Sequence, residues 1–238
     1  GAIAWVQLLN PSVGYLNNVF KWIFNLQTAP FDIYTTGGLA WVLTLFYSPF
    51  AFITISRAME KMDPTLEEAA RVSGSSPLRT LIDVTLPLMA PSILAGGLLV
   101  FIAAGSCFGI PAIVGMPGNI EVMTTRIVTY TYMGDEAGIR DATSLAASLM
   151  FIANALLFFM TWMLGRKDYT TISGKSTRPN IVELGKWKWP AFFAVGFYGF
   201  VAVILPLGSI LLTSLLKSMS KGITLDNLGF DADRKSVV

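Results

Sequence analysis

Residues 142–165 read ATSLAASLMFIANALLFFMTWMLG and include no Asp, Glu, Lys or Arg. Three further stretches share this property: Gly37–Ser56, Val84–Ile120 and Trp189–Leu216. About 20 apolar residues in a helix, at a rise of about 1.5 Å per residue, cross the hydrocarbon core of a bilayer. Each stretch is long enough for one crossing. The sequence therefore predicts an all-α, polytopic membrane protein with about four transmembrane helices.

The composition favours a membrane protein over the alternative of a soluble helical protein with an unusually apolar core. Of the 238 residues, 53% are hydrophobic and 13% are charged, whereas a soluble domain carries about 25% charged residues. A buried helix of a soluble protein is also interrupted by its own polar face. The net charge of +2 indicates no nucleic-acid partner, so the lipid bilayer is the expected surrounding.

The residue types offer little for catalysis or metal binding. Histidine, the commonest metal ligand and general base, is absent from the sequence, and we expect no catalytic residue and no metal site. Cys107 is the single cysteine, so no intrachain disulfide can form, and its apolar neighbours predict a small buried thiol. A membrane enzyme is therefore a weaker alternative. So is an ion-driven secondary transporter, since no charged residue lies within the predicted spans.

Basic residues predict the orientation in the membrane, because Lys and Arg are retained on the cytoplasmic side. Segment 57–87 holds four of them and segment 166–188 holds six, whereas segment 121–141 holds two. We therefore expect 57–87 and 166–188 to be cytoplasmic, the latter as a polar linker. The basic residues of the tail would then lie outside, against the rule: Lys217, Lys221, Arg234 and Lys235.

The segment before the first predicted span, residues 1–36, is expected to lie at the outer membrane interface. Apolar residues recur with helical spacing over 15–24, opposite a polar face that includes Asn17 and Asn18, as in a helix lying in the interface plane. Residues 1–9 are interpreted as the stump of an earlier span. The chain begins with glycine rather than methionine and ends in a charged tail, so we expect both ends to be cuts through a longer polypeptide. Residues 109–120, with two prolines and several glycines, predict an outer loop or re-entrant turn.

Segment 57–87 is long for a connector and carries two helix starts. Asp63 followed by Pro64, and Ser76 followed by Pro77, each place a capping residue before a proline at the first helical position. Gly74 is placed to end the first helix in a left-handed conformation. The pattern predicts a cytoplasmic helix–turn–helix that Pro87 stops or kinks as the chain enters the membrane.

The same segment resembles the EAA loop of binding-protein-dependent ABC importer permeases. That family pattern is E-A-A, three residues, G, nine residues and I-x-L-P. Here Glu68-Ala69-Ala70 is followed at these spacings by Gly74 and by Val84-Thr85-Leu86-Pro87, with valine in place of isoleucine. The resemblance implies a site that couples the permease to an ATPase, made of Glu68, Ala69, Ala70, Arg71, Gly74, Leu86 and Pro87.

The resemblance also implies the partners: a cytoplasmic ABC ATPase dimer, an extracytoplasmic substrate-binding protein and a second permease half, fused or separate. ATP and magnesium would belong to the ATPase, so no cofactor and no enzymatic activity are expected on this chain. The location implied is a bacterial-type inner membrane.

The likeness is strongest to the fused ferric-iron permeases, on residues 1–16, on Glu67–Arg71 and on Ser106–Pro111. Ferric iron is therefore the implied substrate, while thiamine, polyamine, sulfate and phosphonate permeases share the architecture. On this view residues 37–165 are a permease core with spans at about 37–56, 88–108 and 142–165, and 189–238 holds the first span of a second half and a truncated tail.

Polar residues within spans are candidates to line a transport pathway. Asn154, Ser106 and Ser148 are the first choices, with Asn154 preferred because its amide needs a partner that we expect on another helix. The alternative for each serine is a hydrogen bond to its own helix. Further candidates are Ser92, Thr143 and Ser144.

Overall fold

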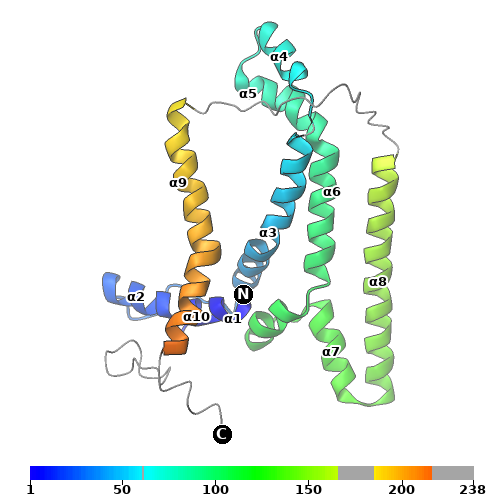
Figure 1. Cartoon of the computed structure of the whole chain (residues 1–238). Coiled ribbons are helices and arrows are strands. Elements are labelled where there is room, and N and C mark those ends of the chain that lie inside the picture. Colours follow the sequence, from blue (N-terminus) through cyan, green and yellow to red (C-terminus); the bar gives the residue numbers. More distant parts are fainter. Residues whose placement is uncertain (61, 166–184, 216–238) are drawn as a thin grey trace. The chain divides into compact units, whose positions relative to one another are not determined.

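A computed structural model describes residues 1–60, 62–165 and 185–215, and the elements it contains there are all helical (Figure 1). Most of the predicted linker, residues 166–184, lies outside the described residues, as does the tail 216–238. In the described part of the chain the predicted all-α class is confirmed.

Four helical segments in the described residues are long and apolar enough to cross a membrane: Thr36–Glu60, Pro77–Gly105, Glu136–Trp162 and Gly185–Leu215. The first is α3. The second consists of α5 (Pro77–Thr80), a π-turn (Leu81–Thr85) and α6 (Leu86–Gly105). The third lies within α8 (Glu136–Gly165), and the fourth contains α9 (Lys188–Gly199), a π-turn (Phe200–Ile204) and α10 (Leu205–Leu215). The four predicted spans each fall on one of these segments.

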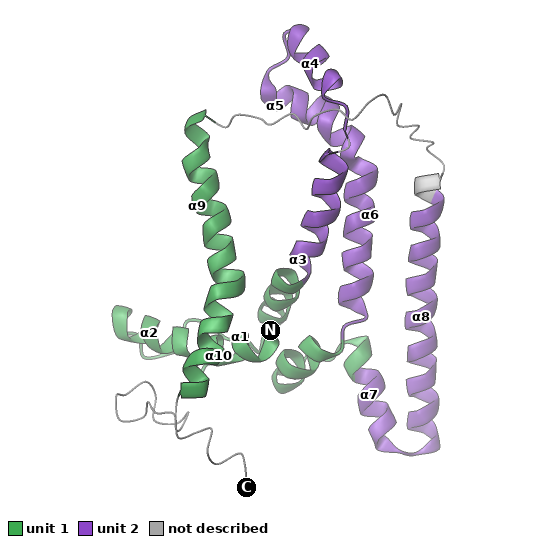
Figure 2. Ribbon diagram, in the orientation of Figure 1, with its two compact units in different colours: residues 1–46, 108–125, 185–238 green, residues 47–107, 126–184 purple. Residues whose placement is uncertain are grey.

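The chain divides into two compact units (Figure 2). Unit 1 contains residues 1–46, 108–125 and 185–238, and unit 2 contains residues 47–107 and 126–184. In unit 1, α1 (Ala2–Leu9) packs against α10 and α2. Buried Ser209 of α10 donates a hydrogen bond to the Ala4 carbonyl at 3.3 Å, so residues distant in the sequence share one small core.

The helix predicted over 15–24 is confirmed as α2, Tyr15–Phe24. Its polar face is not simply solvated, however, because Asn17 is completely buried. The Asn17 amide donates to the Phe31 carbonyl at 2.8 Å and to the Asn10 carbonyl at 3.0 Å, and its oxygen accepts from the Phe31 N–H at 3.1 Å. Such a fully paired buried amide fixes backbone that would otherwise be free to move. Asn17 therefore ties α2 to the chain on both sides of it.

Segment 109–120 forms compact turns rather than an extended loop. A π-turn spans Pro111–Gly115 and a 3-10 turn spans Met116–Gly118. A Cβ at Gly118 would lie 2.2 Å from the Tyr34 carbonyl oxygen, so this close approach of two backbones requires glycine. Val114 is fully buried within the same unit.

Unit 2 contains the C-terminal half of α3, α6, α7 (Met123–Met133, from Arg126 on) and α8. α6 packs along α8, and the Tyr47 hydroxyl of α3 donates to the Ala103 carbonyl of α6 at 3.1 Å. A Cβ at Gly96 would lie 3.4 Å from Thr54, so α6 and α3 pack closely at that glycine. Cys107 is half-buried rather than fully buried. Within this unit the segment 62–80 lies at one end of the helices and α7 lies at the other (Figure 2).

Two prolines inside the membrane segments follow π-turns. The Leu86 N–H bonds to the Leu81 carbonyl just before Pro87, and the Leu205 N–H bonds to the Phe200 carbonyl just before Pro206. Proline has no N–H, and its ring collides with the carbonyl four residues earlier. A π-turn contains one residue more than an α-turn and widens the helix at that point. Of the two alternatives predicted for Pro87, a stop is excluded, because the helix adjusts one turn earlier through the π-turn and continues to Gly105.

Candidate coupling site

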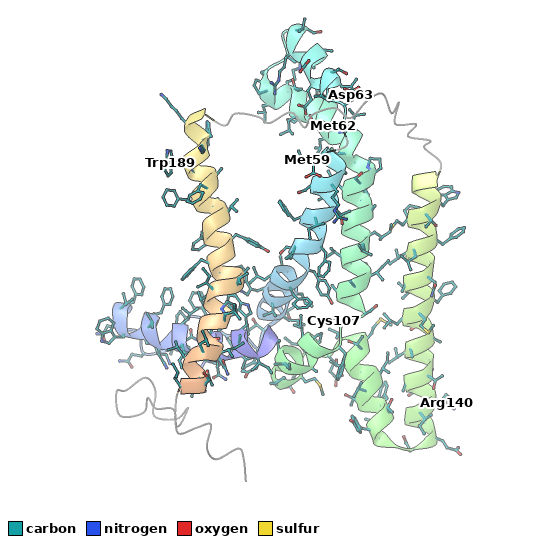
Figure 3. All side chains as sticks on the ribbon, in the orientation of Figure 1. Met59, Met62, Asp63, Cys107, Arg140 and Trp189 are labelled. Atoms are coloured by element: carbon teal, nitrogen blue, oxygen red, sulfur yellow. The ribbon has the colours of Figure 1, made fainter. Side chains whose placement is uncertain are left out.

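The first helix of the loop is α4, Pro64–Val72. Asp63 caps it, with a side-chain oxygen that accepts the Thr65 N–H at 2.9 Å, and Pro64 occupies the first turn. That hydrogen bond lowers the pKa of the Asp63 carboxyl below its ordinary value, because it stabilises the charged form. Figure 3 shows Met59, Met62 and Asp63 following one another from the end of α3 into the loop. The predicted cap is confirmed.

The end of α4 also follows the prediction. Gly74 has a φ of +85°, the left-handed conformation that an L side chain rarely adopts. Its N–H bonds to the Arg71 carbonyl at 2.9 Å, and the Ser75 N–H bonds to the Ala70 carbonyl at 3.1 Å. These bonds satisfy the last carbonyls of the helix, as in a glycine C-cap.

The second helix start is confirmed, but this helix is not separate. The Ser76 hydroxyl accepts the Arg79 N–H at 3.4 Å, and Pro77 follows the cap. α5 then continues through the π-turn into α6 as one segment, Pro77–Gly105. The loop is therefore one short helix, α4, joined by a tight turn to the N-terminal end of a membrane helix.

The residues of α4 divide into a packed face and an exposed face. None of them is fully buried. Half-buried residues recur at Pro64, Glu67 and Ala70, spaced as one side of a helix. The exposed residues cover the remaining sides: Thr65, Leu66, Glu68, Ala69, Arg71 and Val72. Of the two alanines named for the coupling site, Ala69 is therefore exposed and Ala70 lies on the packed side.

A side-chain hydrogen bond joins the packed face of α4 to the π-turn. The Thr85 hydroxyl, 4% exposed, donates to the Glu67 carboxylate at 2.7 Å. A second acceptor, the Thr80 carbonyl, is 3.5 Å away, so the bond to Glu67 is the principal one. Short hydrogen bonds from a hydroxyl to a carboxylate are among the stronger ones in proteins.

The remaining residues predicted for coupling, Leu86 and Pro87, are exposed at the start of α6. Nearby, Arg79 and Asp83 form an ion pair at 3.3 Å with both side chains largely exposed, an arrangement of modest stabilising value. The structure thus brings Glu68, Ala69 and Arg71 to a free surface. It places Gly74, Leu86 and Pro87 where they shape the backbone beneath that surface.

Glu67 and Thr85 cannot be recognised as a pair from residue order. Thr85 occupies the unspecified position of the I-x-L-P pattern, and Glu67 precedes the E-A-A residues. The one available signal was Thr85, a polar residue between two apolar neighbours and two residues before Pro87. Eighteen residues separate the two side chains, and only folding shows that they meet.

The candidates for a pathway make hydrogen bonds within their own helices. Asn154 donates to the Met150 carbonyl at 2.8 Å, so the reason given for preferring it, a required partner on another helix, is wrong. The Ser148 hydroxyl donates to the Leu145 carbonyl at 2.8 Å. Ser106 follows the last residue of α6 and is exposed. In the described residues no three His, Cys, Asp or Glu side chains form a group that could hold a metal.

Comparison with known families defines the class of protein. Residues 9–167 match the family of binding-protein-dependent transport system inner membrane components. This match covers more than half of the chain and includes the whole loop, α4 and its caps. The chain belongs to this family. It is an integral inner-membrane protein, in agreement with the four apolar helical segments in the described residues.

Individual relatives differ in the transport roles that their names give. The ferric transport system permease protein FbpB of Actinobacillus pleuropneumoniae is 27% identical over 195 residues, 81% of this chain and 28% of the relative. The spermidine/putrescine transport system permease protein PotB of Salmonella typhimurium (strain SL1344) is 28% identical over 160 residues, 67% of this chain and 55% of the relative. The sulfate transport system permease protein CysT of Salmonella typhimurium (strain LT2) is 31% identical over 134 residues, 55% of this chain and 48% of the relative. The chain thus spans only about a quarter of the length of the ferric relative.

Proposed function

We propose that the chain is part of the membrane permease of an ATP-driven importer and that the exposed face of α4 is its docking surface for a cytoplasmic ATPase. The observation that supports this most directly is the construction of α4. It is capped separately at both ends, none of its residues is fully buried, and a short turn joins it to a membrane helix. A connector needs no such helix, whereas a docking element needs an ordered and accessible one.

The chemistry of the exposed face is suited to a protein groove. Val72 is 89% exposed and Leu66 is 46% exposed, so apolar surface is available beside the charges of Glu68 and Arg71. The small side chain of Ala69 lies between them along the helix and allows close approach. Apolar contacts surrounded by charges are typical of protein interfaces.

The proposal assigns a separate role to each component of the transporter. ATP and magnesium would bind to the partner ATPase dimer, and this chain would hydrolyse nothing itself. An extracytoplasmic binding protein would deliver the substrate on the opposite side of the membrane. A second permease half, fused or separate, would complete the pathway.

Ferric iron is the substrate we propose. The likeness to the ferric permease extends over 81% of this chain, compared with 67% for the polyamine permease and 55% for the sulfate permease. No set of ligands for a bare trivalent cation is evident in the sequence of the spans. Recognition of iron would therefore belong to the binding protein, and the pathway of the permease would only need to let the ion pass.

Docking is tested by co-purification of the ATPase with variants of the full-length parent polypeptide. Glu68→Ala removes a charge of the proposed surface, and Gly74→Pro cannot adopt the positive φ at the end of α4. We expect both to reduce bound ATPase, Gly74→Pro more strongly. The matched control is Glu136→Ala, an exposed glutamate at the start of α8. Wild-type amounts of ATPase in both loop variants would contradict the proposal.

The substrate is tested separately by uptake of radioactive Fe(III), spermidine or sulfate into cells that express the complete transporter. We expect iron uptake that depends on the transporter and is abolished by Gly74→Pro. Uptake of spermidine or sulfate instead would replace the substrate while leaving the docking proposal intact.

A further inference from the structure

Within the described residues, the side-chain hydrogen bond between α4 and the helix Pro77–Gly105 is the one from Thr85 to Glu67. The backbone also connects the two through the turn at Gly74, but a single turn leaves the helix free to pivot. α4 has no fully buried residue to hold it in place. The orientation of α4 therefore depends strongly on this one contact.

The position of the contact on the membrane helix is informative. Thr85 is the last residue of the π-turn Leu81–Thr85, and Pro87 follows two residues later. The proline excludes regular α-helical bonding to the Asp83 carbonyl, and the π-turn accommodates the proline within a continuous helix. α4 is thus attached at the place where the membrane helix is already irregular and where bending costs least.

The strength of the contact depends on its surroundings. The Thr85 hydroxyl is almost inaccessible to water, and Glu67 is half-buried. Without Thr85, the half-buried Glu67 carboxylate loses this donor, and without Glu67 the Thr85 hydroxyl keeps only the longer contact with the Thr80 carbonyl at 3.5 Å. Weakening the hydrogen bonds of polar groups that are partly shielded from water costs more than the bond itself contributes. The pair therefore resists separation when a force acts on α4.

We infer that Glu67 and Thr85 are positioning residues that make α4 and the first turn of the membrane helix move together. On this view, an ATPase that displaces α4 would transmit the displacement through the pair to the π-turn, and α6 would pivot there. This inference rests on the proposed function, because it supposes that an ATPase acts on α4. Neither residue belongs to the exposed surface that we propose for docking.

The test uses the assembled permease in lipid nanodiscs, with Cys107 and every other cysteine of the assembly replaced by alanine. One pair of spin labels, at Val72→Cys and Leu94→Cys, reports the distance between α4 and α6. A second pair, at Leu94→Cys and Phe151→Cys, reports the distance between α6 and α8. All three positions are exposed and lie in unit 2.

Thr85→Val and Glu67→Ala break the same bond from its two sides. In the permease without ATPase, we expect either change to broaden the distribution of α4–α6 distances by about twofold or more, because a single hydrogen bond no longer selects one orientation. With ATPase bound and trapped by Mg-ATP and vanadate, we expect the shift in the α6–α8 distance to be lost while the ATPase still co-purifies.

Three controls separate positioning from general damage. Glu67→Gln keeps an acceptor oxygen and Thr85→Ser keeps the hydroxyl, so both are expected to retain the narrow distribution and the trapped shift. Thr131→Val removes an exposed hydroxyl of α7 that donates to the Ile127 carbonyl of its own helix at 2.8 Å. It is expected to behave as wild type.

A narrow α4–α6 distribution in both Thr85→Val and Glu67→Ala would overturn the inference, as would a wild-type vanadate shift in both. Failure of the proposed function looks different: the ATPase would not bind to the wild-type permease. The α4–α6 distribution, measured without any ATPase, would still decide whether the pair positions α4.

Discussion

Residues Val84–Leu88 read VTLPL and residues Val203–Leu207 read VILPL. In each, a π-turn ends at the residue immediately before the Leu-Pro pair, and the helix continues beyond the proline. The backbone is thus the same in two parts of the chain. The side chains at the end of the π-turn differ: Thr85 is 4% exposed and bonded to Glu67, whereas Ile204 is 59% exposed.

The prolines themselves also differ in surroundings. Pro206 is buried in unit 1, where α10 packs against α1, while Pro87 is exposed in unit 2. Proline therefore dictates the local backbone at both places through its missing N–H and its ring. The last residue of the π-turn decides whether the turn bonds to another helix, as Thr85 does to α4, or is exposed, as at Ile204. Four predictions follow from this difference.

Thr85→Ile, which converts the first stretch into the second, should have the largest effect. It forces a larger side chain into a buried position and leaves the Glu67 carboxylate without its donor. We expect unit 2 to lose about 2–4 kcal/mol of unfolding free energy from overpacking and the unsatisfied group together. Thermal unfolding in nanodiscs measures this, and a loss below about 0.5 kcal/mol, the usual size for a surface change, would contradict it.

Pro87→Ala should have an intermediate effect. Alanine supplies an N–H that can bond to the Asp83 carbonyl, so the π-turn is no longer required. We expect Thr85 to move relative to Glu67 and α4 to loosen, at a cost of about 1 kcal/mol, the net value of one hydrogen bond. Amide hydrogen exchange over 64–86 should then become faster. Pro206→Ala is the matched control, because the Ile204 side chain has no hydroxyl to bond to another helix. In this variant, amide hydrogen exchange over 64–86 should be unchanged.

Low pH should loosen the start of α4 but leave the π-turn Phe200–Ile204 unaffected. Because the pKa of Asp63 is lowered in the folded state, its contribution is complete above the ordinary Asp pKa of about 3.9 and is lost as pH falls through the lowered value. No titratable group lies within 200–206. A spin label at Val72→Cys should become more mobile at low pH, and Asp63→Asn should remove the part of this change that comes from the cap. Equal pH dependence in Asp63→Asn and in the parent would contradict the prediction.

Ile204→Thr, the reverse exchange, should have the smallest effect. The side chain is exposed and its hydroxyl can bond to a carbonyl of its own helix, so we expect a change within about 0.5 kcal/mol. Thermal unfolding under the conditions used for Thr85→Ile measures it. A loss as large as that of Thr85→Ile would show that the two turns are not different after all.

Several features could be predicted from residue order because their physical causes are local. Uncharged stretches of sufficient length require membrane helices, and Asp63-Pro64, Gly74 and Ser76-Pro77 define helix ends through caps that need no distant partner. The helix Tyr15–Phe24 was equally predictable from its spacing. What residue order did not specify concerns packing: the helix continues through Pro87, Asn17 is buried, and the Asn154 amide donates to a carbonyl of its own helix.

The sequence by itself determined the class of protein, the membrane segments and the capped loop that carries Glu68. These depend on hydropathy and on bonds between residues no more than five positions apart. Only the tertiary structure decided that Glu67 faces inward, that Ala70 packs while Ala69 is free, and that Thr85 holds α4 from within a π-turn. The physical reason is that such a contact depends on the rotation of two helices about their own axes. One extra residue in the π-turn changes that rotation by about 100°, and no local pattern specifies it.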